Sequence, residues 1–298
     1  MSNLTERIGS WLVRNGRELE VETYRYLYGH GSKESVIEAL KAYQNEDGGF
    51  AHGLEPDFWT PTSNPIDTWT ATNTLRLLDL SPEHEMVRTV LSNLAATPYK
   101  EKGIYYFRIP ENNAYPHAPW WHYTDENRIA GYNPTASLVG FILRHADRAS
   151  SLYEEAHATF ETLIEDFQKR PTDEVHELRC FIELYLDLYD IFDLTELQRK
   201  LSEQVERIVD HDENAWFKTY TPTPTQLVRS PETPGYERIK DLLHREIDMI
   251  KGFLEQELRW HVTWSWGQYE EAFEKAKKDW ESVLALGSLM LLDRFDRA

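Results

Sequence analysis

The sequence predicts an all-α protein whose helices form two concentric rings. Apolar residues recur at helical spacing through most of the 298-residue chain, and the period-two alternation of strands is almost absent. Helices that are apolar around most of their circumference alternate with amphipathic ones, which places the first kind inside the second. We therefore expect about ten to twelve helices. Because adjacent helix pairs could not bury their faces alone, we expect a single domain over residues 1–298.

End signals place the first helices. Ser32 caps a helix over residues 33–43, and Gly48-Gly49 stops it because glycine adopts the left-handed conformation needed beyond a helix end. Asn64-Pro65 starts a buried helix that continues to residue 80, since Asn is a good N-cap and Pro is favoured at the first position. The remaining helices are expected at residues 4–28 (broken near Asn15-Gly16), 83–96, from Asn133-Pro134, 152–167, 175–192, 194–209, 236–258 and 279–295.

Three long aromatic-rich segments fall outside this helical pattern, at residues 98–132, 210–235 and 259–269. Ordered loops of this length are uncommon and tend to be functional. The chain holds ten Trp and sixteen Tyr, more than a core of this size needs. We expect the three segments to fold over one end of the helical ring and to line a concave surface.

Composition excludes several classes of function. The net charge of -19 would be repelled by nucleic acid or an anionic membrane surface. No apolar stretch approaches the ~18 residues of a membrane span, and the N-terminus has no apolar signal core. The one cysteine, Cys180, cannot form an internal disulfide and fits a reducing compartment. These features predict a soluble, cytoplasmic protein without nucleic-acid partners; the oligomeric state is not predicted.

The turn Gln44-Asn-Glu-Asp-Gly-Gly-Phe50, between one helix and a buried one, resembles the repeat of terpenoid cyclases and protein prenyltransferases. Those proteins are α/α toroids with a central cavity. The resemblance implies that fold, and a structural role for Gln44 and Phe50, which in that superfamily tie the outer helix to the neighbouring turn. It also favours an isoprenoid or another apolar chain as the ligand.

The catalytic motifs of that superfamily are missing here. The sequence has no Asp-x-Asp-Asp cluster, and Cys180 lacks the context of a zinc triad, so these motifs predict no metal site and the cofactor stays unknown. Asp187, Asp190 and Asp193 loosely resemble a diphosphate-binding run. Their spacing of three also suits one exposed helix stripe, which we prefer.

The first candidate site is the loop before the helix that begins at Asn64-Pro65. Glu55 and Asp57 are candidates for acid and base, or for hard metal ligands with His52. Alternatively, these carboxylates cap neighbouring backbone amides. The candidate substrate contacts of this region are His52, Trp59 and Asp67, the last where a carboxylate meets free N–H groups of a helix.

The second candidate site is the proline-stiffened loop at residues 115–125. Adjacent Trp120 and Trp121 cannot both enter one core easily, so at least one is expected to face a ligand. His122 with Asp125 would form an oriented general base, because a carboxylate fixes the tautomer of an imidazole. His117 is a second candidate base, and Tyr123 a further substrate contact. The alternative is a lid packed by its own side chains.

The third candidate is the run Trp260-His261-Val-Thr-Trp264-Ser-Trp266, in which Trp264 and Trp266 are candidate substrate contacts and core packing is the alternative. Together the three loops favour an enzyme that holds a small, isoprenoid-like molecule in a toroid cavity. A carbohydrate-active hydrolase or lyase is the second hypothesis, because paired carboxylates and Trp-rich loops are typical of glycoside cleavage. A non-catalytic binding or scaffold protein is the third. Whether the chain is an enzyme stays open at this point.

Overall fold

The computed structural model describes residues 3–258, 260 and 262–295, and it is mostly α-helical, which confirms the all-α class. The chain divides into two compact units. Unit 1 comprises Met1–Ala42 and Glu206–Ala298, and unit 2 comprises Tyr43–Val205. The single domain remains a prediction. No helix of the described residues is long and apolar enough to cross a membrane.

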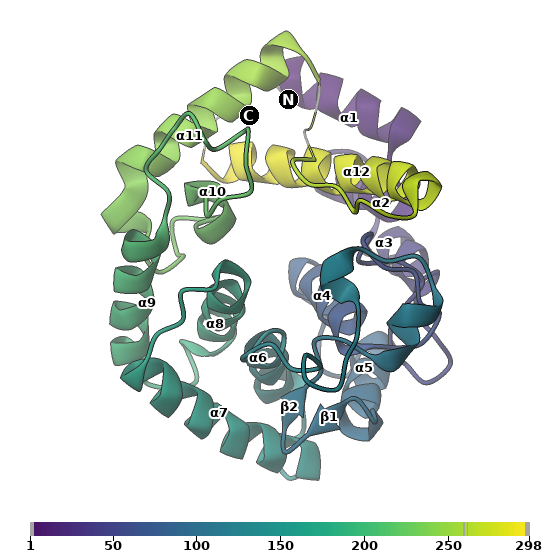
Figure 1. The fold of residues 1–298 in the computed structure, drawn as a ribbon, viewed down its shortest axis with the longest axis vertical. Coiled ribbons are helices and arrows are strands. Elements are labelled where there is room, and N and C mark those ends of the chain that lie inside the picture. Colours follow the sequence, from purple (N-terminus) through teal and green to yellow (C-terminus); the bar gives the residue numbers. More distant parts are fainter. Residues whose placement is uncertain (1–2, 259, 261, 296–298) are drawn as a thin grey trace. The chain divides into compact units, whose positions relative to one another are not determined.

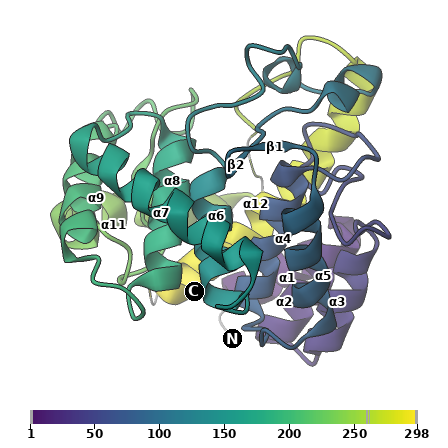
Figure 2. The ribbon, with the colours of Figure 1, turned by 90° about the horizontal axis from the view of Figure 1, so that it is seen from below.

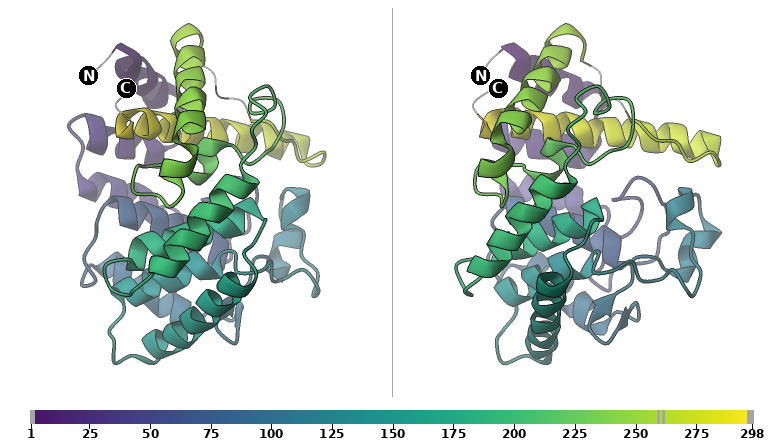
Figure 3. Two further views of the ribbon diagram at one scale, coloured as in Figure 1. Left: turned by 90° about the vertical axis from the view of Figure 1, so that its left-hand side faces the viewer. Right: turned by 60° about the vertical axis from the view of Figure 1, so that its left-hand side comes forward.

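Unit 1 is built from helices at both ends of the chain. In it α1 packs against α2 and α12, α2 packs against α3, and α10 packs against α11. The longest helix described, α12, has 25 residues and is the yellow helix of Figure 3. The helices of this unit are α1 (Asn3–Asn15), α2 (Glu18–Tyr28), α3 (Lys33–Lys41), α10 (Pro224–Leu227), α11 (Tyr236–Gln256) and α12 (Glu270–Arg294).

Unit 2 contains three successive pairs of helices. Figure 1 shows α4, α6 and α8 next to one another, with α5, α7 and α9 along their outer side. A two-stranded antiparallel hairpin and two 3-10 turns lie between α5 and α6 in the chain. The elements are α4 (Pro65–Leu77), α5 (Glu85–Ala96), β1 (Lys100–Glu101), β2 (Ile104–Tyr105), η1 (Pro110–Ala114), η2 (Pro119–Trp121), α6 (Thr135–His145), α7 (Ser151–Lys169), α8 (Val175–Leu188) and α9 (Thr195–Ile208), whose last turn belongs to unit 1.

Helix α6 forms the centre of unit 2. Residues 135–143 are all buried, and α6 packs against α4, α7 and α8. It approaches α8 closely at Gly140, where a Cβ atom would lie 2.9 Å from the Cα atom of Leu184. The apolar circumference expected for this helix therefore reflects neighbours on several sides.

Capping residues fix the helix starts that the sequence predicts. The side chain of Ser32 accepts a hydrogen bond from the Ser35 amide, and that of Asn64 accepts one from the Asp67 amide. Both helices begin directly after these caps, as expected.

Several elements differ from expectation. Helix α3 ends at Lys41, so Gly48, whose φ of 81° is left-handed, serves the following turn rather than the helix end. Helix α12 begins at Glu270, nine residues before the expected start. The sequence did not indicate this start because the first turns of the helix are polar. The hairpin β1–β2 was not expected, since strands of two residues carry no alternation.

The turn at Gln44–Phe50 is hydrogen-bonded to two helices of unit 2, α4 and α5. Nε2 of Gln44 donates hydrogen bonds to the carbonyl of Gly48 (3.0 Å) and to Oγ1 of Thr89 on α5 (3.1 Å). The amide of Phe50 donates to Oγ1 of Thr68 on α4, and its ring is fully buried. Both residues therefore have structural roles.

Candidate functional site

The first two predicted loops lie against each other in unit 2. The amide of Trp59 donates to the carbonyl of Pro116 (3.1 Å), and the amide of Ala118 donates to the carbonyl of Asp57 (2.8 Å). Phe58 and His117 form an isolated antiparallel bridge between these bonds. The segment that carries η1 and η2 extends beyond the helices of unit 2 (Figure 2). The two loops thus form one structure, which we name the loop pair (residues 52–59 and 115–125).

Two histidines of the loop pair form a hydrogen-bonded dyad. Nδ1 of His117 lies 2.7 Å from the carbonyl oxygen of Tyr115, and a carbonyl can only accept, so this nitrogen carries a proton. In the neutral ring Nε2 of His117 is then an acceptor, and it lies 3.2 Å from Nδ1 of His122. His122 is therefore the donor of that bond. When the exposed ring of His122 is neutral, its Nε2 is therefore the nitrogen without a hydrogen.

The expected pairing of His122 with Asp125 is wrong. Oδ1 of Asp125 accepts a 2.7 Å hydrogen bond from the hydroxyl of Tyr123, and that bond raises the pKa of Tyr123. The group that fixes the tautomer of His122 is the buried ring of His117, stacked on it with ring centroids 5.4 Å apart. Spacing along the chain suggested the carboxylate, but in the structure the hydroxyl of Tyr123 bonds it instead.

The adjacent tryptophans have different environments. Trp121 is 6 % exposed and lies between Phe58 and Phe107, with ring centroids 4.8 and 4.6 Å away. Trp120 is 37 % exposed. The first holds the loop pair together, and the second presents its ring to solvent.

The carboxylates of the first loop are less accessible than the histidine. Asp57 is 3 % exposed, and Glu55 is half-buried, with its amide donating to Oδ1 of Asp67. His52 is exposed, and its Nε2 lies 2.9 Å from Oδ1 of Asn45. The indole of half-buried Trp59 donates to the carbonyl of Pro56 (3.0 Å).

Asp67 is fully buried at the start of α4. Its Oδ1 accepts from the amide of Glu55 (2.6 Å), and its Oδ2 accepts from Nδ2 of Asn64 (2.7 Å). Oδ1 therefore joins the loop at residues 52–59 to the helix, and Oδ2 holds the side chain of the N-cap residue Asn64. This geometry assigns Asp67 a positioning role rather than substrate contact.

The third candidate run, at residues 260–266, belongs to unit 1. Trp264 is half-buried and makes edge contacts with Trp280 and Tyr220, with ring centroids 5.3 and 6.1 Å away. Trp266 is 2 % exposed and packs against Phe273, as a core residue does. His261 lies outside the described residues.

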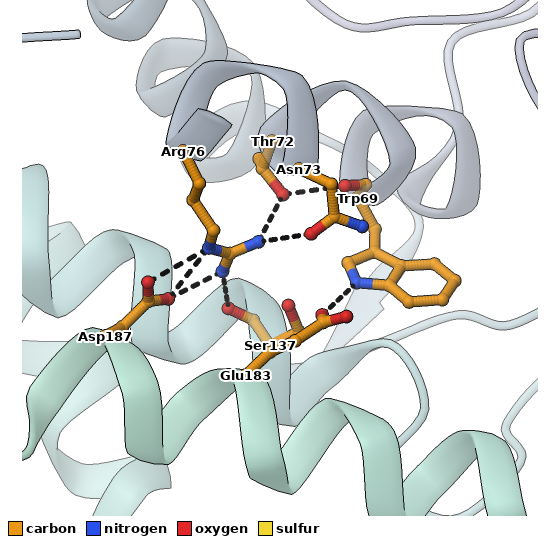
Figure 4. A network of polar contacts seen from close by, with 7 residues as sticks. All are labelled: Trp69, Thr72, Asn73, Arg76, Ser137, Glu183 and Asp187. Carbon is orange, nitrogen blue, oxygen red and sulfur yellow. Dashed lines mark hydrogen bonds and ion pairs between the residues drawn. The ribbon is translucent and has the colours of Figure 1, made fainter. Parts of the chain in front are cut away.

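A polar network between α4, α6 and α8 was missed by the sequence interpretation (Figure 4). Arg76 on α4 donates to both oxygens of Asp187 on α8, at 2.6 to 3.1 Å. Its other N–H groups reach the Ser137 carbonyl of α6, Thr72 and Asn73, so all five donors of the guanidinium are used. Arg76 is thus a structural centre and has no donor left for a ligand.

Burial and charge act against each other in this pair. Burial alone would lower the pKa of Arg76, but Asp187 raises it above its ordinary value. Burial raises the pKa of Asp187, against the effect of the guanidinium. Each charge depends on the other, so losing one partner leaves a buried, uncompensated ion.

The network continues to the more accessible side of the same helices. Nε1 of Trp69, on α4, donates a 2.8 Å hydrogen bond to Oε2 of Glu183, one turn before Asp187 on α8. Both side chains are half-buried. The signal that could have indicated this face is the run of Trp69, Asn73 and Arg76 at helical spacing in a helix expected to be apolar or small.

The three aspartates Asp187, Asp190 and Asp193 do not share a stripe. Asp187 is buried against Arg76, Asp190 pairs with Arg144 on the surface, and Asp193 caps Thr195 after α8 has ended. Among the described residues, no three His, Cys, Asp or Glu side chains are grouped as metal ligands. Cys180 is buried, and burial raises the pKa of its thiol, which does not favour a nucleophile.

Comparisons with protein-family models, with curated proteins and with solved structures found no match for this chain.

Proposed function

We propose that this chain is an enzyme that transfers a proton to or from a small molecule, with Nε2 of His122 as the proton acceptor. The observation that carries the proposal is the run of hydrogen bonds from Tyr115 through His117 to His122. It leaves a basic nitrogen on an exposed ring, and imidazole is the commonest general base in enzymes. The exposed ring of Trp120, two residues away in the chain, offers a flat surface for substrate.

We infer that the helices form an α/α toroid. The successive pairs α4/α5, α6/α7 and α8/α9 support this architecture, as does the turn at Gln44–Phe50 with its bonds to α4 and α5. In such a toroid α4, α6 and α8 would belong to the inner ring, and the loop pair would border the mouth of the cavity. The proposed relation to terpenoid cyclases and prenyltransferases rests on the same turn.

Two classes of ligand have support. The resemblance favours an isoprenoid or another apolar chain. The half-buried side chains of α4 and α8, among them Trp69, Asn73 and Glu183, favour a polar one, because an apolar chain would remove water from these groups without replacing their hydrogen bonds. We therefore place a polar small molecule first and an isoprenoid second.

The test is a turnover screen with polar metabolites and prenyl compounds, followed by NMR and mass spectrometry. His122→Gln should lower turnover by about 10²- to 10⁴-fold, the usual contribution of a general base. Asp125→Asn is the matched control and should stay within about twofold, because Asp125 bonds Tyr123. Full activity of His122→Gln, or equal loss in both variants, would overturn the proposal.

A further inference from the structure

The indole of Trp69 is fixed in an unusual environment on unit 2. Its hydrogen bond to Glu183 joins α4 to α8 and sets the plane of the ring (Figure 4). Within the described residues the ring makes no aromatic or cation–π contact, and the side chain is only half-buried. A large aromatic surface is therefore held in position without a protein ring packed against it.

Two hydrogen-bonding atoms beside this ring are unused by the described residues. Oε2 of Glu183 bonds the indole, which leaves Oε1 as a free acceptor. Oδ1 of Asn73 bonds Arg76, which leaves Nδ2 as a free donor on the same side of α4, one turn from Trp69. The face thus combines an aromatic surface, an acceptor and a donor.

The Arg76–Asp187 pair holds this face in place. Asn73 is oriented by Arg76, and Glu183 lies one turn from Asp187 on α8. Arg76 and Asp187 neutralise each other. Glu183 forms no ion pair with the described residues, so its carboxylate gives this face a negative charge. Rigid polar groups beside a free ring are typical of specific small-molecule sites.

We propose that Trp69, Asn73 and Glu183 form a binding subsite for a carbohydrate. The apolar face of a sugar ring stacks on an indole, while its hydroxyls both donate and accept, which matches Glu183 Oε1 and Asn73 Nδ2. An organic cation would use the carboxylate and the ring but would leave the amide donor unpaired. A prenyl diphosphate would bring negative charge towards Glu183. The subsite does not depend on proton transfer by His122.

The experiment is isothermal titration of the full chain with cellotetraose, maltotetraose and xylotetraose, with choline and farnesyl diphosphate as comparison ligands. At least one tetrasaccharide should bind with a Kd of about 1 mM or tighter. Trp69→Ala should weaken that binding about tenfold or more, and Glu183→Gln and Asn73→Ala several-fold. Phe253→Ala, which removes an exposed aromatic ring of α11 outside both proposed sites, should leave it within about twofold.

Trp69→Phe keeps an aromatic ring and removes the bond to Glu183. If Trp69→Ala fails to fold, Trp69→Phe replaces it in the titration. His122→Gln should bind the tetrasaccharide like the wild type, which separates failure of this subsite from failure of the proposed base. The inference is overturned if no tetrasaccharide binds, if the Trp69 and Glu183 variants bind unchanged, or if choline or farnesyl diphosphate binds in their place.

Discussion

Arg76 and Asp187 join α4 to α8 through three hydrogen bonds, and both side chains are at least four-fifths buried. Nothing near either residue in the chain indicates the other, because 111 positions separate them. Arg76 also contacts α6, because its guanidinium donates to the carbonyl of Ser137. This connection is the main polar link between the elements that carry Trp69 and Glu183.

Asp187→Asn should lower the free energy of unfolding by about 3–5 kcal/mol, since it leaves the Arg76 charge buried without its partner. Asp190→Asn, three residues further along the chain, is the matched control. Its pair with Arg144 is largely exposed, so the expected loss is below about 1 kcal/mol. Urea unfolding measures both, and equal losses would contradict a structural role for the Arg76–Asp187 pair.

His145 should make the stability depend on pH. Burial lowers the pKa of this ring to about 4, with Arg76 and Arg144 adding to the shift and Asp79 opposing it. A lowered histidine pKa means that the folded state resists protonation. Its contribution is therefore complete above pH 6.5, the ordinary value, and is lost as the pH falls from 6.5 towards 4.

After discounting for the partial exposure of the ring, the loss is about 1–2 kcal/mol. His145→Asn removes the titrating group, so its free energy of unfolding should fall less than that of the wild type between pH 7.5 and 4.5. Parallel pH profiles of the two proteins, measured by urea unfolding, would show that His145 is not responsible.

Asp67→Asn should destabilise unit 2 by about 1–3 kcal/mol. Both oxygens of Asp67 accept hydrogen bonds, so an amide nitrogen would place a donor against a donor and leave a buried group unpaired. Glu161→Gln is the control, because Glu161 is 70 % exposed and should change stability by less than about 0.5 kcal/mol. If both variants melt at the wild-type midpoint, Asp67 has no positioning role and is again a candidate substrate contact.

The parts of the fold that depend on local chemistry were predictable from the sequence. Ser32 and Asn64 each cap a helix by accepting from the amide three residues further on, so the helix starts follow from local sequence. The start of α12 at Glu270 does not, because its first turns have no apolar stripe and tertiary contacts further along decide the helix.

The candidate site also combines features that local sequence predicts with features that depend on distant contacts. Aromatic and proline content indicated the loop pair and its histidines, but the partner of His122 depends on how the loop turns. The face formed by Trp69 and Glu183 joins residues 114 positions apart, and a single sequence carries no signal for such a contact. Spacing also misled at Asp187, Asp190 and Asp193, because α8 ends at Leu188 and the second and third aspartates are no longer helical.

Two glycines should respond to alanine in opposite directions. Gly252 lies inside α11 with no atom within 4 Å of an added Cβ, so Gly252→Ala should stabilise the protein by about 0.5–1 kcal/mol through helix propensity. Gly48 has a φ of 81°, and its Cβ would lie 2.4 Å from the carbonyl oxygen of Thr89. Because that atom is backbone and cannot rotate away, Gly48→Ala should cost about 2 kcal/mol or more. Thermal unfolding of the two variants should bracket the wild-type midpoint. If Gly48→Ala melts at or above the wild type, the turn between Gln44 and Phe50 is not the rigid link described above.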